Sequence, residues 1–204
     1  MMKELLMKKY LRLIVVMLAF YHPLAMAHSR EAAGFISGFL HPLFGPDHLL
    51  AMLGVGIISA RIDGHYIWSI PGLFVLFMVL GGILGANGIL FPMVEWGIAL
   101  SVLVLGIAII VVKRANISLL MVVMLFVAFF GFLHGHAHGV EMPDSISPYY
   151  YSFGFVISTS LIHILGVLIG HFSTKRQRLE KMPSYVGGFM AVAGCLILYG
   201  LTQS

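Results

Sequence analysis

Charged side chains are scarce in this chain of 204 residues: only 10% are Asp, Glu, Lys or Arg, whereas 60% are hydrophobic. A soluble domain typically carries about 25% charged residues. The composition, with a mean hydropathy of +1.00, therefore excludes an ordinary soluble globular protein. Cysteine is rarer still. The one cysteine, Cys195, has no partner within the chain, which excludes an intrachain disulfide and argues against thiolate-based metal binding.

Long hydrophobic runs fill most of the chain beyond its N-terminal region. We expect six spans, at 32–60, 66–86, 92–112, 117–138, 149–172 and 184–202. Each is long enough to cross the hydrocarbon core, so the predicted fold class is an all-α polytopic membrane protein with six transmembrane helices. The first span is expected to be kinked, because Pro42, Gly45 and Pro46 interrupt it. Broken spans of this kind commonly line binding sites at membrane depth.

The N-terminal residues have the pattern of a cleavable secretory signal peptide. Four basic residues precede a short apolar run at 13–21, and Ala25-Met26-Ala27 supplies small residues for cleavage. The alternative is an uncleaved anchor helix, but that run is too short to span about 30 Å of hydrocarbon. We therefore expect a signal peptide at 1–27 and one six-helix transmembrane domain at 28–204.

Cleavage at this point makes His28 the new N-terminus. A terminal histidine offers its α-amine and its ring Nδ1 as a chelating pair. The alternative is that His28 is merely the first residue of a frayed tail.

The distribution of basic residues predicts the orientation. Although the net charge of +4 alone is compatible with nucleic-acid binding, the basic residues gather in the loops on one side of the predicted membrane. Seven of the eight that follow residue 27 lie there: Arg61, Lys113, Arg114, Lys175, Arg176, Arg178 and Lys181. The loops on the other side, around 87–91 and 139–148, contain no Lys or Arg. The positive-inside rule then places the mature N-terminus outside, so the lipid bilayer, and not nucleic acid, is the expected partner.

The kinked first span contains His41, Asp47 and His48. Imidazoles and carboxylates cost several kcal/mol in hydrocarbon, so a cluster of them within a span is usually functional. His41 and His48 are seven residues apart and therefore share one helical face, with Asp47 beside them. The alternative is a buried hydrogen-bonded network that holds the kinked helix.

The fourth span ends in a second donor set. His134, His138 and Glu141 follow a helical stripe at i, i+4 and i+7, whereas His136 points elsewhere. Because Gly135 and Gly139 weaken a helix, an exposed histidine-rich loop is the alternative.

Two isolated donors complete the candidate metal ligands. Glu95 opens the third span near the outer surface, where it is either a ligand or an interfacial carboxylate at a helix N-terminus. His163 lies in the middle of the fifth span and is either a ligand or a satisfied core histidine. Nitrogen and oxygen donors with few sulfurs favour Ni(II), Co(II) or Zn(II) over Cu(I).

A short repeat relates the two halves of the chain. The tetrapeptide Gly38–His41 of the first span recurs as Gly131–His134 in the fourth. Two three-helix halves would have opposite orientations, as in transporters built from a 3+3 inverted repeat. Four matched residues in a chain rich in Gly, Phe and Leu also arise by chance.

At these residues the chain resembles the HupE/UreJ family of nickel and cobalt permeases. The resemblance rests on His41-Pro42-x-x-Gly45-x-Asp47-His48, followed by Leu49–Met52, and on His134-Gly135-x-Ala137-His138-Gly139-x-Glu141. Weaker matches surround Glu95 and His163. The resemblance implies a permease of the bacterial inner membrane that supplies metal for hydrogenase or urease maturation. It implies ligand roles for His41, Asp47, His48, Glu95, His134, His138 and Glu141, and a capture role for His28.

The predicted function is therefore transport of Ni(II) or Co(II) into the cytoplasm, with no catalytic reaction and no organic cofactor. Two alternatives use the same donors. An intramembrane zinc-dependent hydrolase would activate water at the metal, although the HExxH motif is absent. A membrane metal sensor or accessory subunit would bind metal without moving it.

Overall fold

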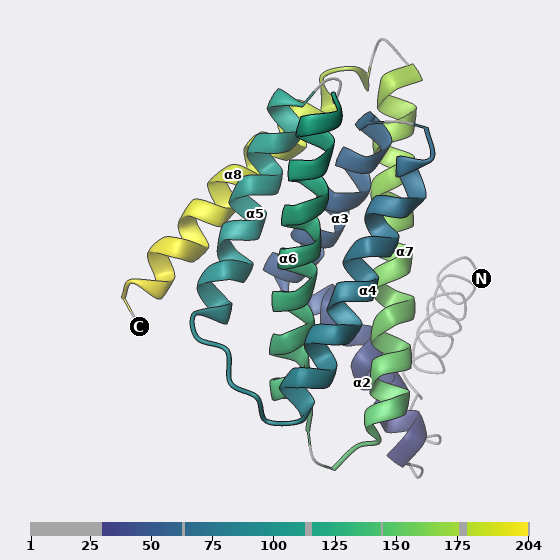
Figure 1. The fold of residues 1–204 in the computed structure, drawn as a ribbon, viewed down its shortest axis with the longest axis vertical. Coiled ribbons are helices and arrows are strands. Elements are labelled where there is room, and N and C mark those ends of the chain that lie inside the picture. The colour runs from purple at the N-terminus through teal and green to yellow at the C-terminus, as the bar shows by residue number, and fades with distance from the viewer. Residues whose placement is uncertain (1–29, 63, 113–115, 144, 176–178, 204) are drawn as a thin grey trace, which may run out of the picture.

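The computed structural model describes residues 30–62, 64–112, 116–143, 145–175 and 179–203. Within these ranges it contains no strand, only α-helices: α2 (Arg30–Phe44), α3 (Pro46–Ile62), α4 (Tyr66–Ala86), α5 (Val94–Val111), α6 (Ile117–Glu141), α7 (Pro148–Lys175) and α8 (Met182–Leu201), as Figure 1 shows. Five of them are long and apolar enough to cross a membrane, and the bent pair α2–α3 adds a sixth candidate when its two helices are counted as one span. The all-α prediction is confirmed, whereas the predicted signal peptide and His28 lie outside the described residues.

The predicted kink is a full break between two helices. α2 and α3 are bent by 79° across Gly45. Pro46 has no backbone N–H and disfavours the helical conformation of the residue before it, so α2 ends there and Pro46 becomes the first residue of a new helix. The break therefore places His41 in the last turn of one helix and His48 in the first turn of the next.

α3 lies at the centre of the bundle, with α7 along one side and α5 and α4 against others. From Ala51 to Ala60 nearly every residue of α3 is buried. α2 also packs on α7, α5 packs on α8, and α4 packs along α6 (Figure 1). The outward faces of these helices are apolar, as a lipid-facing surface requires.

The inverted repeat stays a prediction. The break in α2–α3 has no counterpart in α6, which is described without interruption from Ile117 to Glu141. The first tetrapeptide lies just before the break, and the second lies in the C-terminal half of α6.

α4 and α6 approach each other as closely as their backbones allow. Glycines line both sides of the contact: Gly81, Gly82 and Gly85 on α4, and Gly131, Gly135 and Gly139 on α6. A Cβ atom at Gly135 would collide with the Met78 carbonyl oxygen, and one at Gly139 with the Gly82 carbonyl oxygen. In a membrane the hydrophobic effect does not drive helices together. Small residues instead stabilise the contact, because they allow the two backbones to pack closely. The glycines predicted to weaken a helix instead fix where α6 lies, and the helix continues to Glu141, so the loop alternative is wrong.

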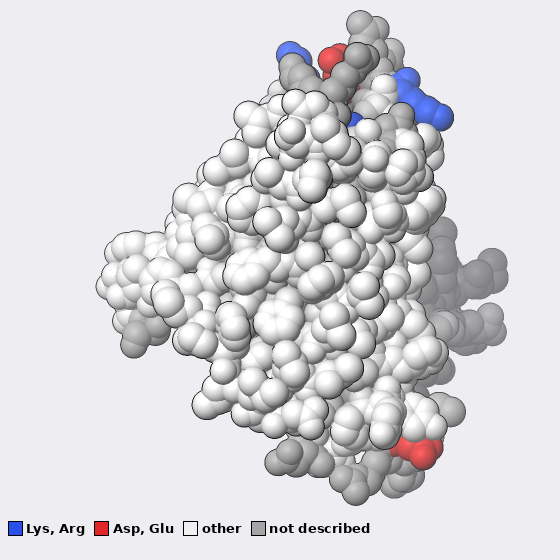
Figure 2. Space-filling view, viewed as in Figure 1, with Lys and Arg blue, Asp and Glu red and all other residues white. Residues whose placement is uncertain are grey.

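Charge separates along the long axis of the molecule. Arg61, Lys175 and Lys181 lie at the ends of α3, α7 and α8 that meet on one side, which we call the basic end. Figure 2 shows Lys and Arg gathered at this end and a broad uncharged face beyond it. Arg61 Nε also donates a hydrogen bond to the Val112 carbonyl at 2.9 Å, which ties α3 to the end of α5.

We expect Gly135→Ala to destabilise the protein, because the added methyl group meets backbone that cannot rotate away. Overpacking of this kind costs about 1–3 kcal/mol. Gly72→Ala in α4 is the matched control, since a Cβ atom there meets nothing within 4 Å. Thermal unfolding of the purified proteins in detergent measures both, and a midpoint for Gly135→Ala at or above that of Gly72→Ala would contradict the close packing.

Candidate metal site

Four imidazoles converge where the α2–α3 break faces α6. His138 lies between two of them, with ring centroids 4.5 Å from His41 and 4.4 Å from His48. His48 in turn lies 4.9 Å from His134. We call His41, His48, His134 and His138 the histidine cluster. The sequence predicted two separate donor sets, and the fold brings them together into one.

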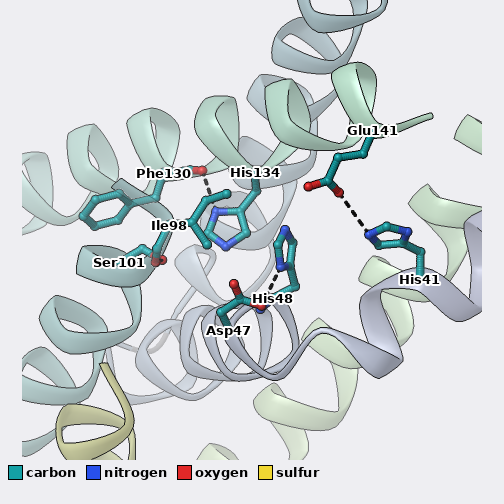
Figure 3. A network of polar contacts seen from close by, with 8 residues as sticks. All are labelled: His41, Asp47, His48, Ile98, Ser101, Phe130, His134 and Glu141. Atoms are coloured by element: carbon teal, nitrogen blue, oxygen red, sulfur yellow. Dashed lines mark hydrogen bonds and ion pairs between the residues drawn. The ribbon is translucent and has the colours of Figure 1, made fainter. Parts of the chain in front are cut away.

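Hydrogen bonds fix two of these rings. The Nδ1–H of His134 donates to the Phe130 carbonyl at 2.8 Å, and His48 Nδ1 lies 2.8 Å from Asp47 Oδ1 (Figure 3). The same carboxylate oxygen accepts from the backbone N–H of His48 at 2.9 Å, at the start of α3 where a helix favours negative charge. With Nδ1 as the donor in both rings, each Nε2 keeps its lone pair. Metal-binding histidines are typically oriented in this way by a carbonyl or a carboxylate.

Four further ring nitrogens of the cluster are buried and have no hydrogen-bond partner among the described residues. They are Nε2 of His48, Nε2 of His134 and both ring nitrogens of His138. A buried polar atom left without a partner costs about 1–3 kcal/mol. Several of them within one small cluster fit a bound divalent cation, because neutral imidazole is a common ligand of such ions.

A carboxylate lies at the margin of the cluster. Glu141 Oε2 is 3.5 Å from His41 Nε2, and the potential ligand atoms of His41, His138 and Glu141 all lie within 4.8 Å of one another. The side chains of Glu141 and His41 are 48% and 34% exposed, whereas His134 is fully buried. The donors therefore form a series from an accessible carboxylate to an enclosed imidazole.

The structure places the other predicted site residues around this cluster. Glu95, in the first turn of α5, is exposed and near enough to Asp47 and Glu141 to interact electrostatically with both. His163 lies deeper, and its ring contacts Phe74. His136 points away from the cluster, as predicted, and donates a hydrogen bond from Nε2 to the Ile89 carbonyl at 2.6 Å. His136 thus ties α6 to the loop between α4 and α5.

Two aromatic residues of α7 contact the cluster although the sequence analysis did not single them out. The Phe155 ring lies 4.0 Å from the His138 ring, and the Tyr151 ring lies 6.2 Å from the His41 ring. Both residues line a cavity of about 460 Å³ between α4, α6 and α7, and His138 lies in its wall. Neither residue belongs to a sequence motif, so hydrophobic periodicity alone could not predict its contact with the cluster.

Gly45 shapes the site without supplying a ligand. A Cβ atom there would lie 3.2 Å from both Asp47 Oδ1 and His48 Nδ1, and so would displace the pair that orients the His48 ring. We expect Gly45→Ala to lower the affinity for Ni(II) about 10–100-fold, the usual cost of disturbing groups that orient a metal ligand. Gly188→Ala in α8, where a Cβ atom meets nothing within 4 Å, is the control. Calorimetric titration of the purified proteins measures both, and equal affinities would contradict the orienting role.

The chain was compared with known proteins. A family model described as HupE / UreJ protein matches residues 14–197. "Protein HupE" of Rhizobium leguminosarum bv. viciae is 36% identical over 196 residues, which cover 94% of this chain and 100% of that protein. No solved structure matches. The two histidine motifs, the bundle of long apolar helices and these matches agree, and the chain belongs to the HupE/UreJ family.

Proposed function

We propose that the protein is a permease that carries Ni(II), and Co(II) by the same path, across the bacterial inner membrane into the cytoplasm. One observation carries the proposal: two imidazoles from the broken span converge with two from α6, and three of the four rings have buried nitrogens without a partner among the described residues. Membership of the HupE/UreJ family supports it, and no described residue adds an observation that favours a hydrolase or a sensor.

The donor series suggests how an ion enters. Glu95 and Glu141, with His28 if it becomes the N-terminus, capture the hydrated cation at the outer surface. The ion then exchanges water for the imidazoles of His41 and His138, and next for those of His48 and His134. The carboxylates compensate its charge at the margin, and Asp47 does so beside His48. Neutral imidazoles supply exchangeable bonds deeper in the membrane, where an unpaired carboxylate would be costly.

The charge separation supports the proposed orientation. The positive-inside rule favours a cytoplasmic location for the basic end, and the cluster, which lies toward the opposite end of α6, then faces the periplasm. The chain contains no P-loop motif for nucleotide binding, so it does not power transport itself. We propose that the delivered metal serves hydrogenase or urease maturation.

Uptake of radioactive nickel into cells that lack their own nickel importers tests the function. We expect His48→Ala and Glu141→Gln each to lower the uptake rate by about tenfold or more at matched membrane abundance, since loss of even an outer group costs about 10–100-fold. Excess Co(II) should compete, whereas Mg(II), which prefers oxygen ligands and keeps its water, should not.

Two variants control for surface effects. His65→Ala removes an exposed histidine and Glu180→Gln an exposed carboxylate, both at the basic end and far from the cluster. Both should transport at the wild-type rate. A wild-type protein that is well inserted but takes up no nickel would refute the permease.

Uptake should also depend on pH. A metal binds only the neutral imidazole, and an ordinary histidine titrates near pH 6.5. Protons therefore displace the ion as the pH falls, and we expect uptake to decline below about pH 6. Proteoliposomes with equal pH on both sides remove any pH gradient as a cause. A constant rate from about pH 7.5 to about pH 5 would count against histidine ligation.

A further inference from the structure

The buried face of α7 carries a line of polar groups that the cluster does not include. Tyr151 Oη, Ser158 Oγ, Thr159 Oγ1 and both ring nitrogens of His163 are buried without a hydrogen-bond partner among the described residues. Hydroxyl groups in helices ordinarily donate to a carbonyl of the preceding turn. Ser160 of the same helix does so, to Val156 at 2.7 Å. The absence of this bond at Ser158 and Thr159 is therefore a local feature of one face.

These polar groups are spread along the length of α7 and do not form a single cluster. Residues 151, 158, 159 and 163 fall on one face of α7, at intervals of seven, one and four. At 1.5 Å per residue, Tyr151 and His163 are about 18 Å apart along the helix. The Tyr151 ring lies beside His41 of the cluster, so the line begins at the cluster and leads toward the basic end.

His163 lies at the inner end of this line, beyond the cluster. The Phe74 ring separates the two, with ring centroids 5.5 Å from His134 and 5.1 Å from His163. The imidazole of His163 is only 2% exposed and, with both nitrogens unpartnered, has the same character as His138.

A second cavity begins at His163. It has a volume of about 270 Å³ and lies between α7 and the N-terminal half of α4, with Trp68, Val75 and Ser160 in its wall. That half of α4 is the half nearer the basic end. His163 therefore lies between the histidine cluster and a cavity that is nearer the basic end.

We propose that His163 is a second, inner binding station for the transported divalent cation, distinct from the histidine cluster. This inference rests on the proposed function. A cation that leaves His134 passes the Phe74 ring, retains water that the hydroxyls of Ser158 and Thr159 hydrogen-bond, and binds the His163 imidazole. It then leaves through the inner cavity. The station explains why a ring with two unsatisfied nitrogens lies in mid-membrane, where a leucine would pack at lower cost.

A direct test replaces His163 with cysteine, whose thiolate gives a characteristic absorption when it binds Co(II). In a Cys195→Ser background, His163→Cys puts the only thiol of the protein at this position. A thiolate bound to Co(II) gives a charge-transfer absorption in the near ultraviolet that imidazole does not. We expect this band when Co(II) is added to the purified protein. Ile162→Cys is the matched control, since this neighbouring residue is also buried but does not line the second cavity, and it should give no band.

A second measurement separates binding from flux. In proteoliposomes, His163→Ala should lower nickel flux by about tenfold or more, the order of a lost ligand-supporting group. Its equilibrium affinity for Ni(II) at the cluster should change by less than about twofold, because distant sites act additively. The retained affinity also shows that the variant is folded, and His163→Gln repeats the measurement with a polar side chain of similar size.

The outcomes of these tests are distinct. Absence of flux through the wild-type protein would refute the permease and the station with it. Wild-type flux together with normal flux through His163→Ala would refute the station alone. So would a Co(II) spectrum of His163→Cys that matches that of Ile162→Cys.

Discussion

The break at Gly45–Pro46 is the constraint on which the candidate site depends. A continuous helix through this segment would hold His41 and His48 about 10 Å apart along one axis, at 1.5 Å per residue. The 79° turn instead presents them from two directions to the same ring, His138, at 4.5 and 4.4 Å. It also creates a helix N-terminus at the site, where Asp47 is favoured and orients His48. Pro46 thus accounts both for the angle between α2 and α3 and for the helix N-terminus that favours the Asp47 carboxylate.

The part of the site on α6, with His134 and His138, is positioned by close helix packing. α6 is unbroken, and its glycines allow it to lie directly against the α4 backbone. Because backbone contacts cannot relax by side-chain rotation, His134 and His138 are fixed relative to α4, and His136 anchors the following loop through Ile89. The site therefore joins a bent segment to a tightly packed helix. The bent segment is itself held by close backbone contacts with α7, since a Cβ atom at Gly38 or Gly56 would collide with a carbonyl oxygen of that helix.

Much of the fold was readable from the sequence. The hydrophobic runs predicted the bounds of α4 to α8, and the outer bounds of the bent pair α2–α3, to within a few residues, because lipid demands long apolar helices. The interruption at Pro42, Gly45 and Pro46 predicted where the first span would break. Periodicity could not predict that the two donor sets converge, since it records the face of one helix and not which helix lies opposite. Tyr151 and Phe155 escaped notice for the same reason, because an aromatic residue in an apolar helix has no signature until its neighbours are known.

If the proposed function holds, the arrangement of charge and exposure explains why the deep candidate ligands are imidazoles. A site made only of carboxylates would bind a dication strongly but would leave uncompensated anions in the membrane between ions. Here the carboxylates of Glu95 and Glu141 are exposed, where water stabilises them, and the enclosed donors His134 and His138 are imidazoles, which have a neutral form. Transport also requires that binding be weak enough to release the ion. A ring such as His138, with neither nitrogen engaged by the described protein, can exchange partners without breaking an internal hydrogen bond. The same reasoning applies to the proposed station at His163, whose two ring nitrogens also have no partner among the described residues. Both proposed sites could therefore release an ion without breaking an internal hydrogen bond.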